Sequence, residues 1–116
     1  MARTAITRTT IPHTIVRNAA VTEADADDSN GNKFDNTEGK ALLMVRNITG
    51  GSATITIASV ADPNTGRTAD ISQSVAGGET RVFGPFEPSL YNQSDNTINV
   101  NSTVGTGVKV SVLLPA

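Results

Sequence analysis

The 116-residue chain has no cysteine, no tryptophan and a single histidine. Without cysteine there are no disulfides, no thiolate metal ligands and no cysteine nucleophile. The lone histidine, His13, has no H-x-x-H partner, so the sequence lacks the usual pattern of a zinc site. These absences remove several kinds of catalytic and metal-binding chemistry and predict no bound cofactor.

Other features are scarce as well. The net charge is -2 and the pI is near 5.2, which argues against nucleic-acid binding because that function normally leaves a basic footprint. No stretch approaches the ~20 apolar residues that span a bilayer, so we expect no membrane partner. The first 18 residues contain arginines but no apolar core, which is unlike a secretory signal.

What the chain does contain suits strands joined by turns. Its apolar residues are mainly Val, Ile, Leu and Ala, and Thr, Ser, Asn and Gly supply most of the rest. Residues 41–47 form a continuous apolar run, which is typical of a strand buried on both faces or central in a sandwich. No helix is predicted beyond one short turn within residues 19–28. Strands are predicted at residues 14–17, 41–47, 53–59, 70–75, 79–83, 97–101 and 107–114.

Short strands at this spacing predict an all-β fold, a single antiparallel β-sandwich or small barrel. The pattern does not distinguish a jelly roll from an Ig-like Greek key. Residues 1–13 lack a turn-bounded partner and are expected to form an extended N-terminal arm, with the sandwich domain at residues 14–116. Residues 83–92 gather three of the four aromatic side chains around two prolines, which predicts a rigid loop.

Residues 25–36, DADDSNGNKFDN, resemble a calcium-binding EF-hand loop at first sight. With Gly31 at the required glycine position, the first ligand would be Ala26 and the closing ligand Thr37, and neither supplies a carboxylate. Starting from Asp25 instead, asparagines occupy both the glycine and the closing positions. The stretch therefore fails as an EF-hand, although a calcium site of another loop type stays open. The alternative is a solvated turn in which the Asn-Gly pair adopts positive φ.

Catalysis has little support in the sequence. A Ser-His-Asp relay would depend on His13, which lies in the predicted arm and therefore on a poor platform for accurate positioning. The glycine-rich pieces at residues 77–78 and 105–107 lack the lysine and helix of a phosphate-binding loop. We expect no enzymatic activity.

The order of several motifs is similar to that in the small all-β capsid decoration, or cement, proteins of tailed bacteriophages. The similarity covers residues 30–116, and its most specific part is GPFEPSLYNQ at residues 84–93. The other motifs are NGNKF at residues 30–34, Asn36, Gly39, LMVRN at 43–47, a Thr/Ile strand, VAGGETR at 75–81 and a final Val-rich strand.

This resemblance implies a structural virion protein, made in the host cytoplasm, that binds the major capsid protein on the outside of the expanded shell and stabilises it, commonly as a homotrimer. The lack of cysteine is compatible with a virion or intracellular location. The alternative is a host-surface or glycan-binding module that uses the acidic loop and a bound cation.

Contacts with the capsid or between subunits are expected from the arm and from the aromatic segment. A free arm can add a strand to a neighbouring sheet, and its arginines could face the acidic residues 23–28 of another subunit. The candidate contact residues are Arg3, Arg8, Ile11, His13, Phe86 and Tyr91.

Overall fold

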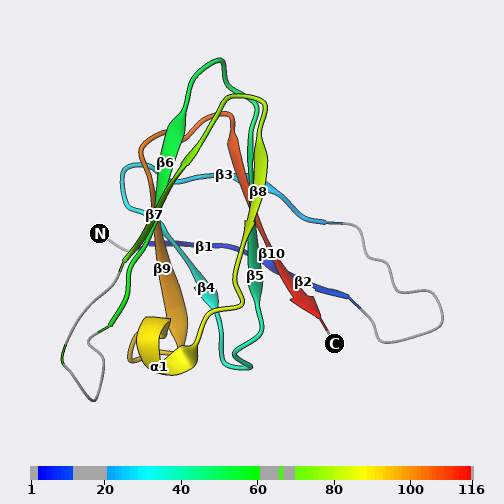
Figure 1. Cartoon of the computed structure of the whole chain (residues 1–116). Helices are drawn as coiled ribbons and strands as arrows, with labels where there is room; N and C mark the ends of the chain where they lie inside the picture. The colour runs from blue at the N-terminus through cyan, green and yellow to red at the C-terminus, as the bar shows by residue number, and fades with distance from the viewer. Residues whose placement is uncertain (1–2, 12–20, 61–65, 67–69, 116) are drawn as a thin grey trace.

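The computed structural model describes residues 3–11, 21–60, 66 and 70–115, which form two packed β-sheets (Figure 1). This confirms the predicted all-β sandwich. The first sheet has the strand order β1 (Thr4–Ala5), β4 (Asn32–Asp35), β9 (Thr97–Ser102), β6 (Ala53–Ile57) and β7 (Ile71–Val75). The second has the order β2 (Arg8–Ile11), β10 (Val108–Pro115), β5 (Leu42–Asn47) and β8 (Thr80–Phe83), and β3 (Ala24–Asp25) also pairs with β10.

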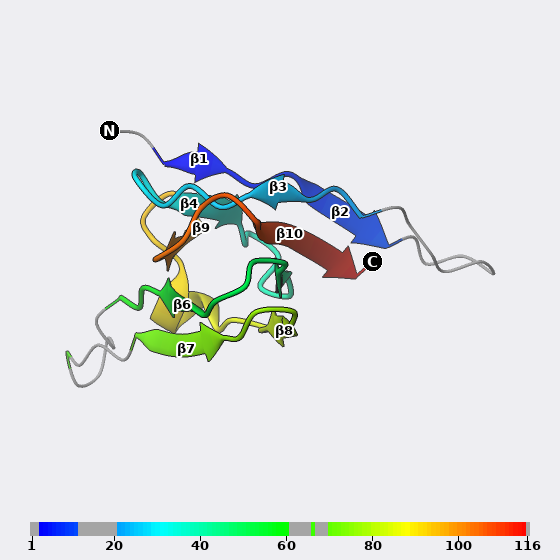
Figure 2. The ribbon, with the colours of Figure 1, turned by 90° about the horizontal axis from the view of Figure 1, so that it is seen from above.

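The N-terminal strands run along one side of both sheets, whereas β7 and β8 lie on the opposite side (Figure 2). β1 pairs in parallel with β4, and β2 pairs in parallel with β10. The remaining pairs are antiparallel, so both sheets are mixed rather than purely antiparallel as predicted.

Residues 3–11 therefore differ from the expected free arm, because they contribute an edge strand to each sheet. Ile6, between these two strands, is only 7% exposed and belongs to the hydrophobic core. Burial of this side chain and the backbone pairing of its flanking strands offset the entropy of ordering the segment. Residues 12 and 13 lie outside the described part of the chain.

The core lies between the sheets, where alternate residues of each strand point inward. On β5, Leu43 and Val45 are fully buried while their neighbours are more exposed, as the two-residue period of a strand requires. Phe34, on β4, is 1% exposed and anchors the segment after the acidic turn. That turn places Gly31 at a φ of 81°, in the left-handed region that the Asn-Gly pair predicts.

Two buried asparagines link elements at opposite ends of the sandwich. Asn47 donates from Nδ2 to the carbonyls of Val75 (2.9 Å) and Gly51 (2.8 Å). Asn36 donates from Nδ2 to Asn92 Oδ1 (2.7 Å) and to the Phe86 carbonyl (3.2 Å). Hydrogen bonding of this kind is what makes a buried amide tolerable.

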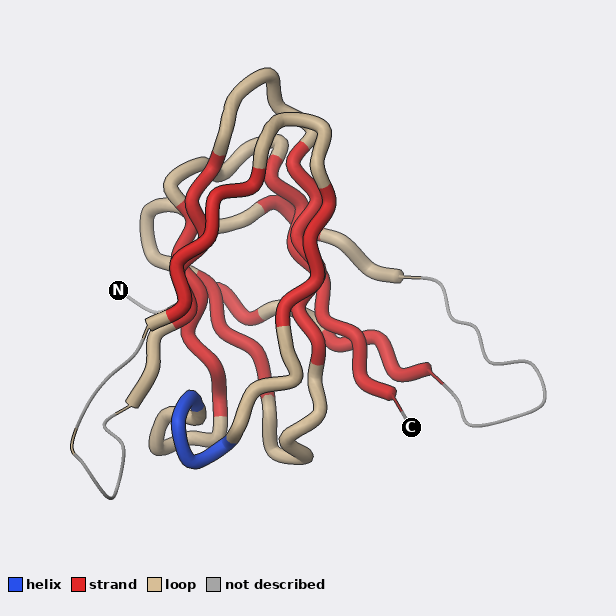
Figure 3. The backbone as a smooth tube through the Cα atoms, in the orientation of Figure 1, coloured by secondary structure: helices blue, strands red, loops and turns tan. Residues whose placement is uncertain are grey.

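The six strands predicted between residues 41 and 114 match β5 to β10 except at their ends. Strands form nearly all of the regular secondary structure in Figure 3. The sequence does not predict β1 to β4. The polar residues of β4 resemble a turn, and β3 lies within residues 19–28, where at most a short helical turn is expected. The predicted rigid loop contains a four-residue helix, α1 (Pro88–Tyr91), with proline in its first turn, where the missing N–H has no helical partner to lose. The strand predicted at residues 14–17 lies outside the described residues.

Candidate functional site

The acidic stretch is used to build the fold. Asp27 Oδ1 accepts hydrogen bonds from the backbone N–H groups of Ser29 (3.2 Å) and Asn30 (3.0 Å), which closes the turn. Its Oδ2 accepts from the Thr4 hydroxyl at 2.6 Å, joining the turn to β1. The Thr4 hydroxyl and then the Asn30 backbone hold the pKa of Asp27 below its usual value of 3.8.

Neighbouring acids pair with cations of the same chain. Glu23 lies 2.8 Å from the Arg46 guanidinium, and Asp25 lies 2.7 Å from Lys109 Nζ. Hydrogen bonds from these cations lower the pKa of both carboxyl groups. Within the described residues, no three His, Asp or Glu side chains gather closely enough to hold a metal ion. The acidic stretch thus favours the turn interpretation over the ion-site one.

Arg3 and Arg8, predicted to contact the capsid or another subunit, bond to residues of the same chain. Arg3 donates from Nη1 to Asn101 Oδ1 at 2.8 Å and to two backbone carbonyls. Arg8 forms ion pairs with Glu38 (2.7 Å) and Asp35 (3.4 Å). These bonds tie the N-terminal segment to β4 and β9 and to the loop that follows β4.

Of the other predicted contact residues, Ile11 is half-buried at the end of β2, in register with the last residue of β10. Phe86 is 2% exposed and packs with Phe34 and Tyr91, with ring centroids 5.9 and 5.7 Å apart. Tyr91 is partly buried against the same core. A side chain as buried as Phe86 has almost no surface to offer a partner. His13 lies outside the described residues.

A surface that the residue predictions did not include lies on the outside of the second sheet. Because Leu43, Val45, Phe83 and Val112 point inward, the residues that alternate with them point outward. Four of these outward residues are apolar, Leu42, Met44, Val82 and Leu113, and we call them the apolar face. Ser111, also outward and opposite Met44, is fully buried, so the chain itself already covers that part of the face.

The strand register brings these four side chains into two neighbouring cross-strand pairs. Leu42 is opposite Leu113, and Met44 is opposite Val82. Val82 is 57% exposed, and the other three are half-buried. Residues 21–23 lie beside this face, since the Thr22 N–H donates to Thr9 Oγ1 (3.2 Å) and Glu23 pairs with Arg46.

The outside of the first sheet is different in kind. Its outward positions on β6, β7 and β9 carry hydroxyl and amide side chains, and in the strand register Thr56 lies opposite both Ser72 and Asn101. We call this surface the polar face, and it is made by Thr54, Thr56, Ser72, Ser74, Thr97, Asn99 and Asn101.

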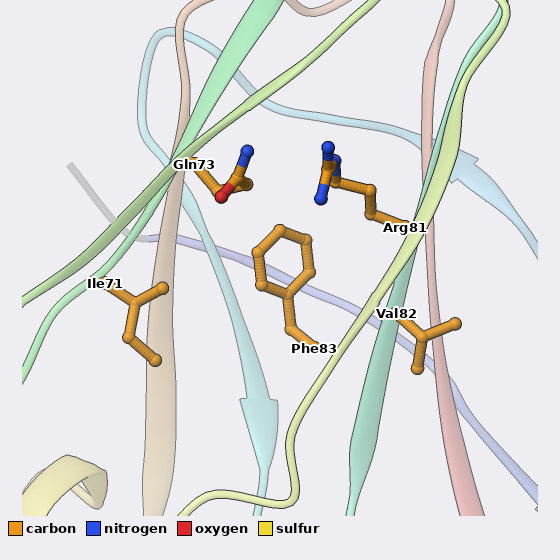
Figure 4. A pocket seen from close by; sticks show the side chains of 5 residues that line it. All are labelled: Ile71, Gln73, Arg81, Val82 and Phe83. Carbon is orange, nitrogen blue, oxygen red and sulfur yellow. The ribbon is translucent and has the colours of Figure 1, made fainter.

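The two sheets separate along one side, between β7 and β8, and leave an open cleft of about 460 Å³ there. Figure 4 shows Gln73 and Arg81 pointing into this cleft from opposite strands, with the Phe83 ring between them. Ile71 and Val82 complete its lining. Arg81 is held by Glu79, with Nε 2.9 Å from Oε1, and this bond lowers the pKa of Glu79.

A sequence signal for the apolar face does exist. The continuous apolar run at residues 41–47 predicts a strand buried on both faces, and the structure covers β5 fully on one face only. The cleft had no comparable signal, because its lining comes from two strands that do not pair.

Comparison with known proteins gives no relative: no protein-family model, curated protein or solved structure matches the chain. In the described part of the chain, no helix has the length and apolar character needed to cross a membrane.

Proposed function

We propose that this chain is a structural protein of a tailed-phage particle, which binds the outer surface of the expanded capsid shell and stabilises it. The observation that carries the proposal is the apolar face. A sheet that faces water normally alternates apolar and polar residues, but here β10, β5 and β8 each place at least one apolar side chain outward, next to the polar Lys109, Arg46 and Thr80. Adjacent apolar side chains that the fold leaves exposed or half-buried are typical of a protein interaction site.

Covering this face would be favourable, since apolar area contributes roughly 25 cal/mol for each Å² removed from water. Three copies held together would multiply a modest contact through effective concentration, provided that all three engage the lattice at once. Preferential binding to the expanded lattice would stabilise that state, because a ligand shifts an equilibrium toward the state it binds better.

The resemblance to capsid decoration proteins also supports this proposal, and the structure shows how its motif is used in the fold. In its most specific motif, GPFEPSLYNQ, Phe86 is buried and Tyr91 packs beside it. Asn92, from the same motif, exchanges hydrogen bonds with Asn36 at 2.7 and 3.1 Å. The motif therefore specifies a corner of the sandwich, and the interaction surface that we propose uses other residues.

The experiment uses expanded shells that lack this protein, from the phage whose genome encodes it, and measures co-sedimentation. Wild-type chain should bind at a fixed ratio and raise the temperature at which the shells disrupt. Val82→Asp places a charge on the apolar face and should weaken binding by about tenfold or more, since burying an unpaired charge is costly.

The matched control is Asn101→Asp, which adds the same charge to the polar face and keeps an acceptor for Arg3. We expect this variant to bind like wild type. If Val82→Asp binds shells as well as wild type, the apolar face is not the surface that binds the capsid. Reproducible sugar binding by the wild-type chain on a glycan array, with no binding to shells, would favour the glycan-binding alternative.

A further inference from the structure

The cleft between β7 and β8 is bordered by two sheet edges. β7 is the last strand of the first sheet and β8 the last strand of the second, and neither pairs with another described strand on its outer side. An edge strand presents unpaired backbone N–H and C=O groups that can pair with another chain.

The register identifies which groups of β7 are free. Thr54 exchanges hydrogen bonds with Thr103, toward β9, so the residues that alternate with it on β6, including Ile55, direct their backbone groups to β7. Ile55 is opposite Gln73, and the backbone groups of Ser72 and Ser74 therefore point to the free edge. The Gln73 side chain donates to the Ser74 carbonyl at 3.0 Å, which agrees with that direction.

The two edges differ in how they are protected. Soluble proteins usually guard an edge with a charge, a proline, a bulge or a very short strand. β8 carries Arg81, whose side chain points into the cleft, and β1 at the far edge of the first sheet has only two residues. β7, with the sequence ISQSV, has five residues and none of these devices.

We propose that β7 binds an extended segment of a partner polypeptide, which adds to the first sheet as a further strand and places an acidic side chain opposite Arg81. The outward backbone groups of Ser72 and Ser74 require an extended chain, because only a strand presents donors and acceptors at matching spacing. Binding at the Ser74 carbonyl displaces the Gln73 side chain that now donates to it. A strand added to β7 lies about 4.8 Å from it, on the cleft side where Phe83 forms an apolar floor.

The acidic preference follows from the charge in the cleft. Arg81 uses Nε and Nη2 for Glu79, and a carboxylate on the added strand can accept from Nη1. Side chains alternate along a strand, so the segment has apolar residues on either side of the acidic position, spaced by two, to cover Phe83 and Ile71. This inference rests on the proposed function for the source of the segment, a capsid subunit.

The test needs no particles, so its failure is distinguishable from failure of shell binding. A display library of linear peptides of about ten residues is panned against the full-length wild-type chain. Enriched peptides should combine alternating apolar residues with an Asp or Glu. Ser72→Pro removes the outward N–H without touching the β6 ladder and should weaken their binding by about tenfold. Ser72→Ala keeps the N–H and should bind like wild type.

Two further variants make the result decisive. Ser74→Pro repeats the edge block at the second free N–H if Ser72→Pro fails to fold, and Arg81→Gln should remove the acidic preference while keeping apolar alternation. Absence of enriched peptides, or peptides that bind both proline variants as well as wild type, overturns the proposal. Wild-type self-association in sedimentation that the proline variants abolish, without peptide enrichment, assigns the edge to a second copy and also overturns it.

Discussion

The outer faces of the two sheets have the same strand geometry and opposite chemistry. In the first sheet, outward positions hold hydroxyls and amides, as in the cross-strand pair Thr56 and Ser72. In the second, the corresponding pair on the β5 and β8 strands is Met44 and Val82. Both sheets contribute fully buried side chains to one shared core, so their inner faces do not explain the difference.

A two-layer sandwich needs only one apolar face on each sheet. The polar face follows this rule, and the apolar face goes beyond it. Side chains that the fold does not require to be apolar are the ones that can respond to a partner. The comparison therefore separates residues that build the sandwich from residues available for binding.

The largest expected effect tests this separation on one strand. Leu43→Ala empties a fully buried position and should lower the free energy of unfolding by about 2–5 kcal/mol. Leu42→Ala, one residue away on the half-buried apolar face, should cost about 1 kcal/mol or less. Urea unfolding of both variants measures the difference. Equal losses would mean that the apolar face is a second core.

The next effect concerns the polar residue that links the two sheets. Asn47→Ala removes the donor to Val75 and Gly51 and the acceptor for Thr49, and should cost about 1–3 kcal/mol because buried backbone groups lose their partners. The control, Asn99→Ala, changes an amide on the half-buried outer face of β9 and should cost less than about 0.5 kcal/mol. Thermal unfolding of the two variants compares them, and a loss as large at Asn99 would contradict the assignment of the polar face as solvent-facing.

A smaller effect is expected when the faces are made alike. The double variant Met44→Thr and Val82→Thr gives the apolar face the chemistry of the polar one, and should weaken shell binding by about tenfold with little change in the unfolding midpoint. The reverse variant, Thr54→Val and Thr56→Val, should increase retention on a hydrophobic column without improving shell binding. Improved shell binding by the reverse variant would show that apolar surface in general, rather than this face, mediates the contact.

Much of this arrangement could be predicted from the sequence, and for physical reasons. Alternation in residues 53–59 and 107–114 identified strands whose inner residues are buried, because one face of each meets the core. The continuous run at residues 41–47 indicated two apolar faces. Long-range strand pairing decides which of the two faces the rest of the chain covers. A local sequence pattern carries no information on that pairing.

The N-terminal residues show the limit of local reasoning. Residues 3–11 have polar composition and no adjacent turn, so they resemble a free arm. Their partners, Asn32 and Val112, are distant in the sequence, and parallel pairing leaves no hairpin signal. The role of Asp27 is hidden from local reasoning for the same reason. Its acidic neighbours suggest an ion site, but its partner is the hydroxyl of Thr4, which is distant in the sequence.

The smallest expected effect is on pH dependence at the border of the apolar face. The hydrogen bond from Arg46 lowers the pKa of Glu23 from its usual value of 4.5. A carboxyl whose pKa is lower in the folded state adds stability above its unfolded value and loses it as pH falls through the folded value. Glu23→Gln should therefore be slightly less stable than wild type at about pH 6, and the difference should shrink as pH falls from 4.5 through the lower folded value. Because the pair is exposed, about 0.5 M salt should shrink the difference at pH 6. Urea midpoints of the two proteins at each pH provide the measurement, and a difference that persists at the lower pH would show that Glu23 supports residues 21–23 by packing rather than by charge.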